Sequence, residues 1–349
     1  MSEAYRAVGW NRQKLIYDGT AVAAVLVYLG TFTAVTLVTN PDVTVETLVI
    51  RAFGTAALLL LHVVLCIGPL CRLDPRFLPL LYNRRHLGVM TFVLGLAHAT
   101  ASIIQFHSLG DVNPLVSVLI GNTRVNSISQ FPFEYLGVVA LTILFLLAAT
   151  SHDFWLANLT APVWKALHMC VYLGYGLLVA HVALGVLQAE THPLLTLFIV
   201  IGPALVLGLH IVAAWRNRAL DREQPVADSG WVDVCGVDDI EESRAKVACV
   251  GGERLAVFRY DGRLSCVSSV CQHQNGPLGE GKVVDGLITC PWHGYQYCPD
   301  TGASPPPFTE RIPTFNLKVV KGRVLVDPRP NPPGTRVEPA VSGREGTIT

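Results

Sequence analysis

The stretch "CQHQNGPLGEGKVVDGLITCPWHG", residues 271–294, decides the fold of the C-terminal part of the chain. It contains a Cys-x-His pair, Cys271 and His273, and after sixteen intervening residues a Cys-x-x-His pair, Cys290 and His293. Two thiolates and two imidazoles can hold a tetrahedral zinc ion. They can equally hold a two-iron cluster, with both cysteines on one iron and both histidines on the other. The spacing alone leaves both kinds of site open.

The residues around the two pairs favour the two-iron cluster. The segments "CQHQNGPLGEG" and "CPWHGYQYCPDTG" resemble the two cluster-binding loops of Rieske proteins. The resemblance extends from Trp231 to Val326 through alternating segments such as "LAVFRY" and "FNLKVVKGRVLV", which are typical of short strands. It implies a small all-β domain over residues 229–328. It also implies a [2Fe-2S] cluster bound by four residues: Cys271, His273, Cys290 and His293.

Three positions in these loops indicate which type of Rieske protein the segment resembles. High-potential respiratory members have an additional cysteine in each loop, which form a disulfide, and a serine after the second His-Gly. The matching positions here are Gly276, Trp292 and Tyr295. The resemblance is therefore to the ferredoxin and oxygenase type, with a potential toward the low end of about −150 to +300 mV. The remaining cysteines of this part are expected to be buried packing residues: Cys235, Cys249, Cys266 and Cys298.

The composition upstream of this segment indicates a membrane. Of 349 residues, 51% are hydrophobic and 15% charged, a balance outside the range of ordinary soluble domains. The net charge of zero hides an uneven distribution, because residues 18–214 carry few charges and residues 215–349 resemble a soluble domain. The chain is therefore expected to have at least two parts, and we expect no nucleic-acid partner.

Residues 18–214 contain six apolar runs, and crossing a bilayer takes about 20 residues. The runs are apolar on all sides, whereas helices of soluble proteins keep a polar stripe. The fold class predicted is a membrane all-α six-helix bundle followed by the small all-β domain. The predicted spans are 18–39, 51–70, 87–107, 133–151, 163–187 and 194–214.

The basic residues predict which ends of these spans are cytoplasmic, because short loops rich in Lys and Arg stay inside. They precede span one, separate spans two and three, open span five and follow span six: Arg6, Arg12, Lys14, Arg72, Arg76, Arg84, Arg85, Lys165, Arg216, Arg218 and Arg222. Residues 1–17, both termini and the cluster segment are therefore expected in the cytoplasm, and the membrane is expected to be a bacterial inner membrane. Cytoplasmic cysteines are reduced thiols or ligands rather than a disulfide framework.

Ionisable residues inside the spans are candidates for function. Arg84 and His98 of span three are fourteen residues apart, and His168 and His181 of span five are thirteen apart. Each separation is about 20 Å along a helix, enough for two haems one above the other. Thirteen residues do not return to the same helix face, so this arrangement requires a bend, expected at residues 174–176. Any single histidine could instead be a core residue.

The segments "NRRHLGVMTFVLGLAHA" and "VWKALHMCVYLGYGLLVAH" resemble spans three and five of the ferric-reductase-like transmembrane family. That family includes ferric reductases, NADPH oxidases and the haem-bearing membrane subunit of periplasmic methionine sulfoxide reductase. The resemblance covers residues 50–214. It implies an outer b-type haem between His98 and His181 and an inner haem at His168. Arg84 falls near the place of the inner partner, as in the methionine sulfoxide reductase subunit, and His86 is the alternative.

Residues 215–228 form a polar linker that leads directly into the β domain, and no glycine-rich dinucleotide fingerprint follows any strand pattern. We therefore expect a transmembrane electron-transfer protein. A separate cytoplasmic reductase or other donor reduces the cluster, and haem passes electrons to an unknown acceptor or quinone on the far face. One alternative is a membrane-tethered Rieske ferredoxin without haem that serves an oxygenase. Another is reverse flow from quinol to the cluster. Residues 329–349 are expected to be a disordered tail.

Overall fold

The structure is a computed structural model. It describes residues 12–81, 83–152, 155, 159, 161–188, 193–218, 221–227, 230–273, 276–292, 294–306 and 308–342. The described residues divide into a helical unit, which ends at Val212, and a β unit, which begins at Ala213. Each unit has its own buried core.

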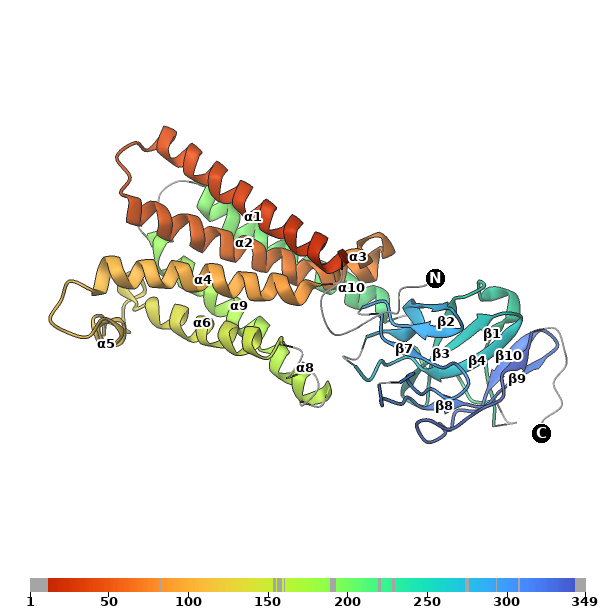
Figure 1. Ribbon diagram of the computed structural model, residues 1–349. Helices are drawn as coiled ribbons and strands as arrows, with labels where there is room; N and C mark the ends of the chain where they lie inside the picture. The colour runs from red at the N-terminus through yellow and green to blue at the C-terminus, as the bar shows by residue number, and fades with distance from the viewer. Residues whose placement is uncertain are drawn as a thin grey trace. The chain divides into compact units, whose positions relative to one another are not determined.

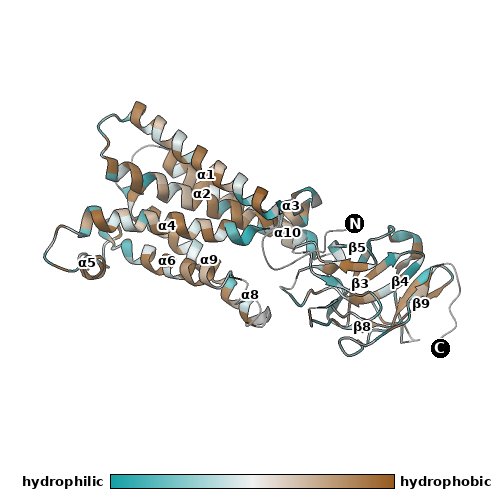
Figure 2. Ribbon diagram, in the orientation of Figure 1, coloured by the Kyte–Doolittle hydropathy of each residue, from teal (hydrophilic) through white to brown (hydrophobic). Residues whose placement is uncertain are grey.

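The helical unit consists of long apolar helices joined by shorter ones (Figure 1). The helices are α1 (Arg12–Thr39), α2 (Val45–Leu73), α3 (Leu78–Leu81), α4 (Arg84–His107), α5 (Pro114–Ile120), α6 (Glu134–Ala149), α8 (Ala161–Met169), α9 (Val171–Leu184) and α10 (Pro193–Asn217). Figure 2 shows hydrophobic colouring around these helices rather than along one stripe. This is the pattern of helices that face lipid as well as each other.

Five helical segments are long and apolar enough to cross a membrane: Lys14–Thr39, Val45–Leu73, Arg84–His107, Val163–Gln188 and Pro193–Asn217. The remaining predicted span corresponds to α6, whose 16 residues fall below that length. It rises about 24 Å, somewhat less than a hydrocarbon core of about 30 Å. The prediction of a helical membrane part is confirmed. The number of helices is not six, because span five is divided and α3 and α5 are additional short helices.

The irregularity in span five lies elsewhere than expected. The helix is interrupted at Cys170, between α8 and α9, whereas residues 174–176 are regular parts of α9. Gly174 has a packing role instead, because a Cβ there would lie 3.3 Å from Ile143 Cγ2 on α6. The close approach of α6 and α9 therefore depends on a small residue, as is common between membrane helices.

Helix α2 contacts α4, α4 contacts α6, and α6 contacts α9. The buried core of the bundle lies where α2, α9 and α10 meet, with Leu61, Tyr175 and Ile199 among its members. Helix α4, which is span three, and helix α9, which belongs to span five, are therefore both neighbours of α6.

The β unit consists of three small antiparallel sheets. Their strands are β1 (Val232–Gly236), β2 (Ala245–Val250), β3 (Glu253–Tyr260), β4 (Arg263–Ser268), β5 (Lys282–Val284), β6 (Leu287–Thr289), β7 (Gln296–Tyr297), β8 (Thr314–Phe315), β9 (Leu317–Val320), β10 (Arg323–Val326) and β11 (Ala340–Val341). One sheet has the order β1-β10-β9, another the order β11-β4-β3-β2 with β8 also on β4, and the third the order β5-β6-β7. The prediction of a small all-β domain is confirmed.

Four of its hairpins use the same two-residue turn. Gly251–Gly252, Asp261–Gly262, Asp285–Gly286 and Lys321–Gly322 all have positive φ at both positions. Two left-handed residues give the turn a twist that matches the right-handed twist of the paired strands. The Gly at the second position adopts this conformation at little cost. The β5–β6 turn closes the hairpin that precedes the Cys-x-x-His pair.

The expectation of a disordered tail is wrong for the part of it that the structure describes. Asn331 donates its backbone N–H to Thr314 O at 2.8 Å, Val337 donates to Asp300 O at 2.7 Å, and β11 pairs with β4. These hydrogen bonds satisfy backbone groups of a segment whose composition alone does not predict an ordered structure. The residues after 342 lie outside the described part of the chain.

Candidate redox sites

The two segments that carry the Cys and His pairs are loops at one end of the β unit. The first cluster loop, residues 271–277, follows β4 and closes with a backbone hydrogen bond from Cys271 to Gly276 O at 2.9 Å. The second cluster loop, residues 290–295, joins β6 to β7 and closes with a bond from Cys290 to Tyr295 O at 2.8 Å. Each predicted cysteine ligand is thus the first residue of a tight loop.

The two loops are in direct contact. A Cβ on Gly276 of the first loop would lie 2.7 Å from Cys290 Sγ and 3.3 Å from the Trp292 ring of the second. The His273 ring lies parallel to the Tyr295 ring, with centroids 4.9 Å apart and an interplanar angle of 11°. The loops that carry the predicted ligands Cys271, His273 and Cys290 are therefore neighbours. His293 lies outside the described residues.

A buried tyrosine lies beside the first cysteine. Tyr297 Oη is 3.4 Å from Cys271 Sγ and accepts the backbone N–H of Gln272 at 3.0 Å. Because the oxygen already accepts from that amide, its proton is available for the sulfur. Burial raises the pKa of Tyr297, so the phenol stays protonated. The sequence pattern did not identify this hydroxyl, because its position depends on the contact of β7 with the first cluster loop.

The donor set fits the cluster that these loops imply. Cys271 and Cys290 are 1% and 2% exposed, which keeps solvent from both sulfurs. The Gly276 position is one that a Cβ would fill, so the glycine leaves room beside the second sulfur. Among the described residues alone, no group of three or more His, Cys, Asp or Glu side chains is close enough to hold a metal ion. The fourth predicted ligand is outside that set.

The other cysteines of the β unit behave as packing residues, with one exception. Cys235 and Cys266 belong to a buried hydrophobic cluster, and Cys249 is buried. Burial raises the pKa of Cys235 to about 11, so it stays a neutral thiol at neutral pH. Cys298 is only half-buried.

In the helical unit, the structure brings His98 of α4 and His181 of α9 together. Their ring centroids are 6.3 Å apart and the ring planes are nearly perpendicular, at 88°. His98 Nδ1 lies 2.9 Å from Ile50 O, and His181 Nδ1 lies 2.9 Å from Phe133 O. A carbonyl oxygen only accepts, so Nδ1 carries the proton in each ring and Nε2 keeps its lone pair. We call these two residues the outer histidine pair.

The spacing of this pair fits two axial ligands of one iron. Imidazole nitrogens bind metals at about 2.0 Å, and the ring centre lies about 1.2 Å behind the nitrogen. Two imidazoles on opposite sides of an iron therefore have centroids about 6.4 Å apart. Nδ1–H donation to a backbone carbonyl is also the usual way that a metal-bound histidine is oriented.

Two glycines make room for these rings. A Cβ on Gly54 would lie 2.8 Å from His98 Nδ1, and a Cβ on Gly137 would lie 2.9 Å from His181 Nδ1. Both distances are below normal contact, so a larger residue would displace the ring. The sequence did not indicate these glycines, because their role depends on which helices are neighbours.

The residues proposed for an inner site are less organised. The His168 ring stacks on Trp164 at 3.7 Å, and its Nδ1 lies 3.0 Å from Trp164 O. Arg84 is near enough to interact with it electrostatically. His86 Nδ1 lies 2.7 Å from Asp18 Oδ2 at the start of α1, so this nitrogen is already engaged. No second histidine ring faces His168 among the described contacts.

The other histidines divide into two kinds. His210 Nε2 accepts from the Tyr172 hydroxyl at 2.9 Å and its Nδ1 bonds Val206 O, so both of its ring nitrogens are bonded to protein groups. His107 Nδ1 bonds Ser117 Oγ and ties α4 to α5. His62 is buried, and neither ring nitrogen has a hydrogen-bond partner.

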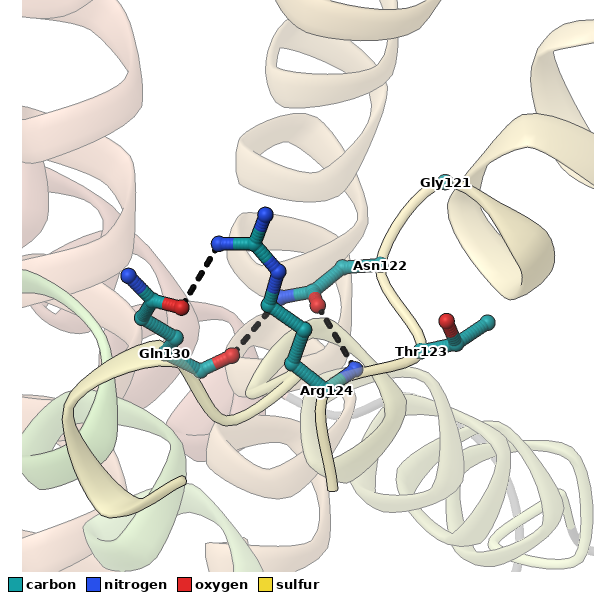
Figure 3. A pocket seen from close by; sticks show the side chains of 5 residues that line it. All are labelled: Gly121, Asn122, Thr123, Arg124 and Gln130. Atoms are coloured by element: carbon teal, nitrogen blue, oxygen red, sulfur yellow. Dashed lines mark hydrogen bonds between the residues drawn. The ribbon is translucent and has the colours of Figure 1, made fainter. Parts of the chain in front are cut away.

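The loop before α6 holds a polar hollow of about 460 Å³ around Arg124 (Figure 3). The guanidinium donates to Gln130 Oε1 at 2.6 Å, Arg124 N donates to Asn122 Oδ1 at 3.0 Å, and Asn122 Nδ2 donates to Gln130 O at 3.0 Å. These bonds shape the loop itself, and every side chain in them is already paired. The hollow is therefore a structural feature of the loop rather than a site.

Two known protein families each match a part of this chain. Residues 53–179 match the family described as ferric reductase like transmembrane component, and residues 230–316 match the Rieske [2Fe-2S] domain. The chain therefore has a ferric-reductase-like membrane domain and a Rieske domain, as the two resemblances implied. The Rieske match supports a [2Fe-2S] cluster, and the apolar helices make this a membrane protein.

Curated relatives include ferredoxins of oxygenase systems. The ferredoxin component of the alkene monooxygenase system of Xanthobacter autotrophicus is 34% identical over 106 residues, which are 30% of this chain and 87% of that protein. The anthranilate 1,2-dioxygenase ferredoxin subunit of Burkholderia cepacia is 31% identical over 98 residues, 28% of this chain and 91% of that protein. A ferredoxin chain solved with the oxygenase of carbazole 1,9a-dioxygenase is 28% identical, with a TM-score of 0.27 over 29% of this chain and 95% of its own. The matches to the two curated ferredoxins support electron transfer.

Proposed function

We propose that this chain, a ferric-reductase-like membrane domain followed by a Rieske domain, carries single electrons across a membrane between a cytoplasmic donor and an acceptor on the far face. A cluster in the Rieske domain and a b-type haem in the bundle supply the one-electron chemistry. The protein's part is to hold the two groups, exclude solvent and fix which side each faces.

The observation that carries this proposal is the outer histidine pair. Both rings are oriented by backbone carbonyls, both keep Nε2 as an acceptor, and their separation suits one iron between them. Glycines at positions 54 and 137 leave space for the rings. A bundle that only tethered a ferredoxin would have no need for two histidines arranged in this way.

The proposed ligand assignments are supported by the ring geometry for the haem and by the loop motif for the cluster. We assign His98 and His181 to an outer haem, and Cys271, His273, Cys290 and His293 to the cluster. His168 with Arg84 is the candidate inner site, for which the stacking of His168 on Trp164 offers less support.

The orientation proposed is that of a protein with both termini and the Rieske domain in the cytoplasm, in a bacterial inner membrane. Asp18 near the start of α1 bonds His86 near the start of α4, so these two helix ends lie on one side. Basic residues at the ends of neighbouring helices, Lys14, Arg72 and Arg84, gather at this end, which favours the cytoplasmic side. A reporter enzyme active only outside the cytoplasm should work when fused within residues 108–132 and fail after Arg218. The reverse result would overturn this orientation.

The haem is tested first by a visible spectrum of the purified full chain. Addition of dithionite should give the sharp bands of a low-spin b-type haem, in addition to two irons and two labile sulfides for the cluster. A protein that contains the cluster and no haem would favour the tethered-ferredoxin alternative.

The order of electron flow is tested by a second experiment. A flavoprotein reductase driven by NADH should reduce the haem of the wild-type protein through the cluster. His293→Ala should leave the haem spectrum intact and slow that reduction by about a hundredfold or more, since the path through the cluster is lost. Haem reduction at the wild-type rate in this variant would exclude the cluster as the point where electrons arrive and favour reverse flow.

A further inference from the structure

A pocket of about 470 Å³ opens between α2 and α10 and is separate from the outer histidine pair. Its walls are almost entirely aliphatic, and they include His62 and Cys66 of α2 and Phe198 and Gly202 of α10. The volume is within the usual range for small-molecule sites, about 300 to 1,000 Å³. No Lys, Arg, Asp or Glu lines it, so a phosphate, a carboxylate or a haem propionate would find no charged partner there.

His62, which lines this pocket, and Tyr175, which packs against His62, both lack hydrogen-bond partners. His62 is 6% exposed, and neither ring nitrogen makes a hydrogen bond. The Tyr175 ring meets it edge to face at 5.4 Å and 86°, and the Tyr175 hydroxyl is also buried without a partner. These three atoms are the only buried side-chain nitrogens and oxygens without a partner in the described helical unit. Such groups are costly inside a membrane unless something satisfies them.

His62 differs in this respect from four other intramembrane histidines. In His98, His168, His181 and His210, Nδ1 is bonded to a backbone carbonyl. The bundle therefore has a regular means of satisfying an imidazole. At His62 the Leu58 backbone is near enough to interact with the ring, but the contact does not have hydrogen-bond geometry. The unused hydrogen-bonding capacity of His62 lies on the wall of the pocket, and the Tyr175 hydroxyl belongs to the ring that packs against it.

The α10 side of the pocket is also unusual. A Cβ on Gly202 would lie only 2.2 Å from His62 Nε2, so a glycine is required where α10 passes the ring. The next residue, Pro203, has no backbone N–H and deprives the Ile199 carbonyl of its helical donor. Ile199 belongs to the same buried cluster as Tyr175. A molecule whose head reaches this point would meet the imidazole of His62, against which the Tyr175 ring packs.

We propose that this pocket binds a lipid-soluble quinone. The aliphatic walls suit an apolar tail that arrives from the bilayer. His62 and the Tyr175 hydroxyl suit a ring carbonyl, and the edges of Tyr175 and Phe198 suit the ring itself. A hydrocarbon chain alone would leave the polar atoms unsatisfied. The quinone would be a membrane partner of the proposed electron transfer, so its physiological role rests on the proposed function. Quinone binding by itself does not depend on that function.

Binding is measured with decylubiquinone added to the detergent-purified full chain, followed by native mass spectrometry and calorimetric titration. We expect saturable binding of one molecule per chain. Carbon-13 labelling of the quinone carbonyls should show an infrared shift on binding that indicates a hydrogen bond. Decanol, which has a similar chain and no quinone ring, should bind at least about a hundredfold more weakly.

Two variants identify the polar partners, and a third serves as a matched control. His62→Leu should weaken binding by about tenfold or more, and Tyr175→Phe by severalfold, because each removes one hydrogen bond and keeps most of the packing. His210→Leu makes the same substitution on the neighbouring helix outside the pocket and should leave the affinity unchanged. The spectrum of any haem at the outer pair reports whether each variant is folded.

Equal affinity in His62→Leu, Tyr175→Phe and the wild-type protein would overturn the proposal, as would equal binding of decanol. Both results would indicate an unspecific lipid groove. Should His62→Leu fail to fold, Tyr175→Phe and the infrared shift still decide. Quinone binding in a protein without haem would contradict the proposed function and leave this inference standing; haem without quinone binding would do the opposite.

Discussion

The two candidate redox sites are built differently: the residues of one come from two neighbouring loops, and those of the other from helices far apart in the sequence. In the β unit, Cys271 and Cys290 each open a loop that is closed by its own backbone hydrogen bond. In the bundle, His98 and His181 depend on carbonyls of other segments, at Ile50 and Phe133. A local site is specified by a short motif, whereas a site between helices is specified by helix packing.

The largest expected effect is in the loop site. Cys290→Ser should abolish the cluster, because a hydroxyl is a poor substitute for a thiolate on iron, and should leave the haem spectrum unchanged. Labile sulfide and the electron paramagnetic resonance signal of the reduced protein are the measurements. Cys298→Ser, at a half-buried cysteine outside the loops, is the matched control and should retain both. A cluster at full occupancy in Cys290→Ser would remove this residue from the ligand set.

A similar loss is expected at the helix site. His181→Ala or His98→Ala should remove the proposed outer haem or convert it to high spin, since each residue is proposed to supply one nitrogen ligand. The visible spectrum and the haem content per chain measure the effect. His210→Ala should retain the low-spin spectrum, because both nitrogens of that ring bond to protein groups. An unchanged spectrum in both ligand variants would place the haem elsewhere in the bundle.

A smaller effect tests whether helix packing, rather than the histidine alone, makes the helix site. Gly137→Ala adds one methyl group 2.9 Å from His181 Nδ1 and should turn the ring away from its carbonyl. We expect haem content to fall by about two- to tenfold, in line with the loss of a group that orients a ligand. Gly176→Ala, on α9 with no atom within 4 Å of the added Cβ, should have no such effect. Equal haem content in the two variants would show that the close contact is not required.

The smallest effect concerns the loop site, where a neighbouring hydroxyl tunes the cysteine. Tyr297→Phe removes the proton donor beside Cys271 Sγ and should lower the cluster potential by some tens of millivolts, because the hydrogen bond stabilises the more negative, reduced state. Redox titration followed by electron paramagnetic resonance measures the shift. Tyr260→Phe is the control, since that hydroxyl bonds Ser265. An equal potential in Tyr297→Phe and the wild-type protein would mean that the hydroxyl does not act on the sulfur.

The sequence by itself determined the membrane part, the β domain and the residues of the cluster loops. Long apolar runs have few alternatives to transmembrane helices, because a backbone in lipid must satisfy its own hydrogen bonds. The loop motif is similarly local. The cysteine and the histidine of each pair are only two or three positions apart in the sequence, so the chain itself keeps them close. Sequence also identified His98 and His181 as candidates, through the likeness of spans three and five to a known family.

Only the tertiary structure decided how those candidates are used. Which nitrogen of His98 and His181 carries the proton depends on carbonyls that lie far away in the sequence. The break in span five lies at Cys170 rather than at residues 174–176, and part of the predicted tail joins the sheet through β11. His62 and His210 are alike in the sequence, yet one is unsatisfied at a pocket and the other fully bonded. Hydropathy and spacing depend only on residue type and position in the sequence. A hydrogen bond or a close glycine contact depends on which segments are neighbours in the folded chain.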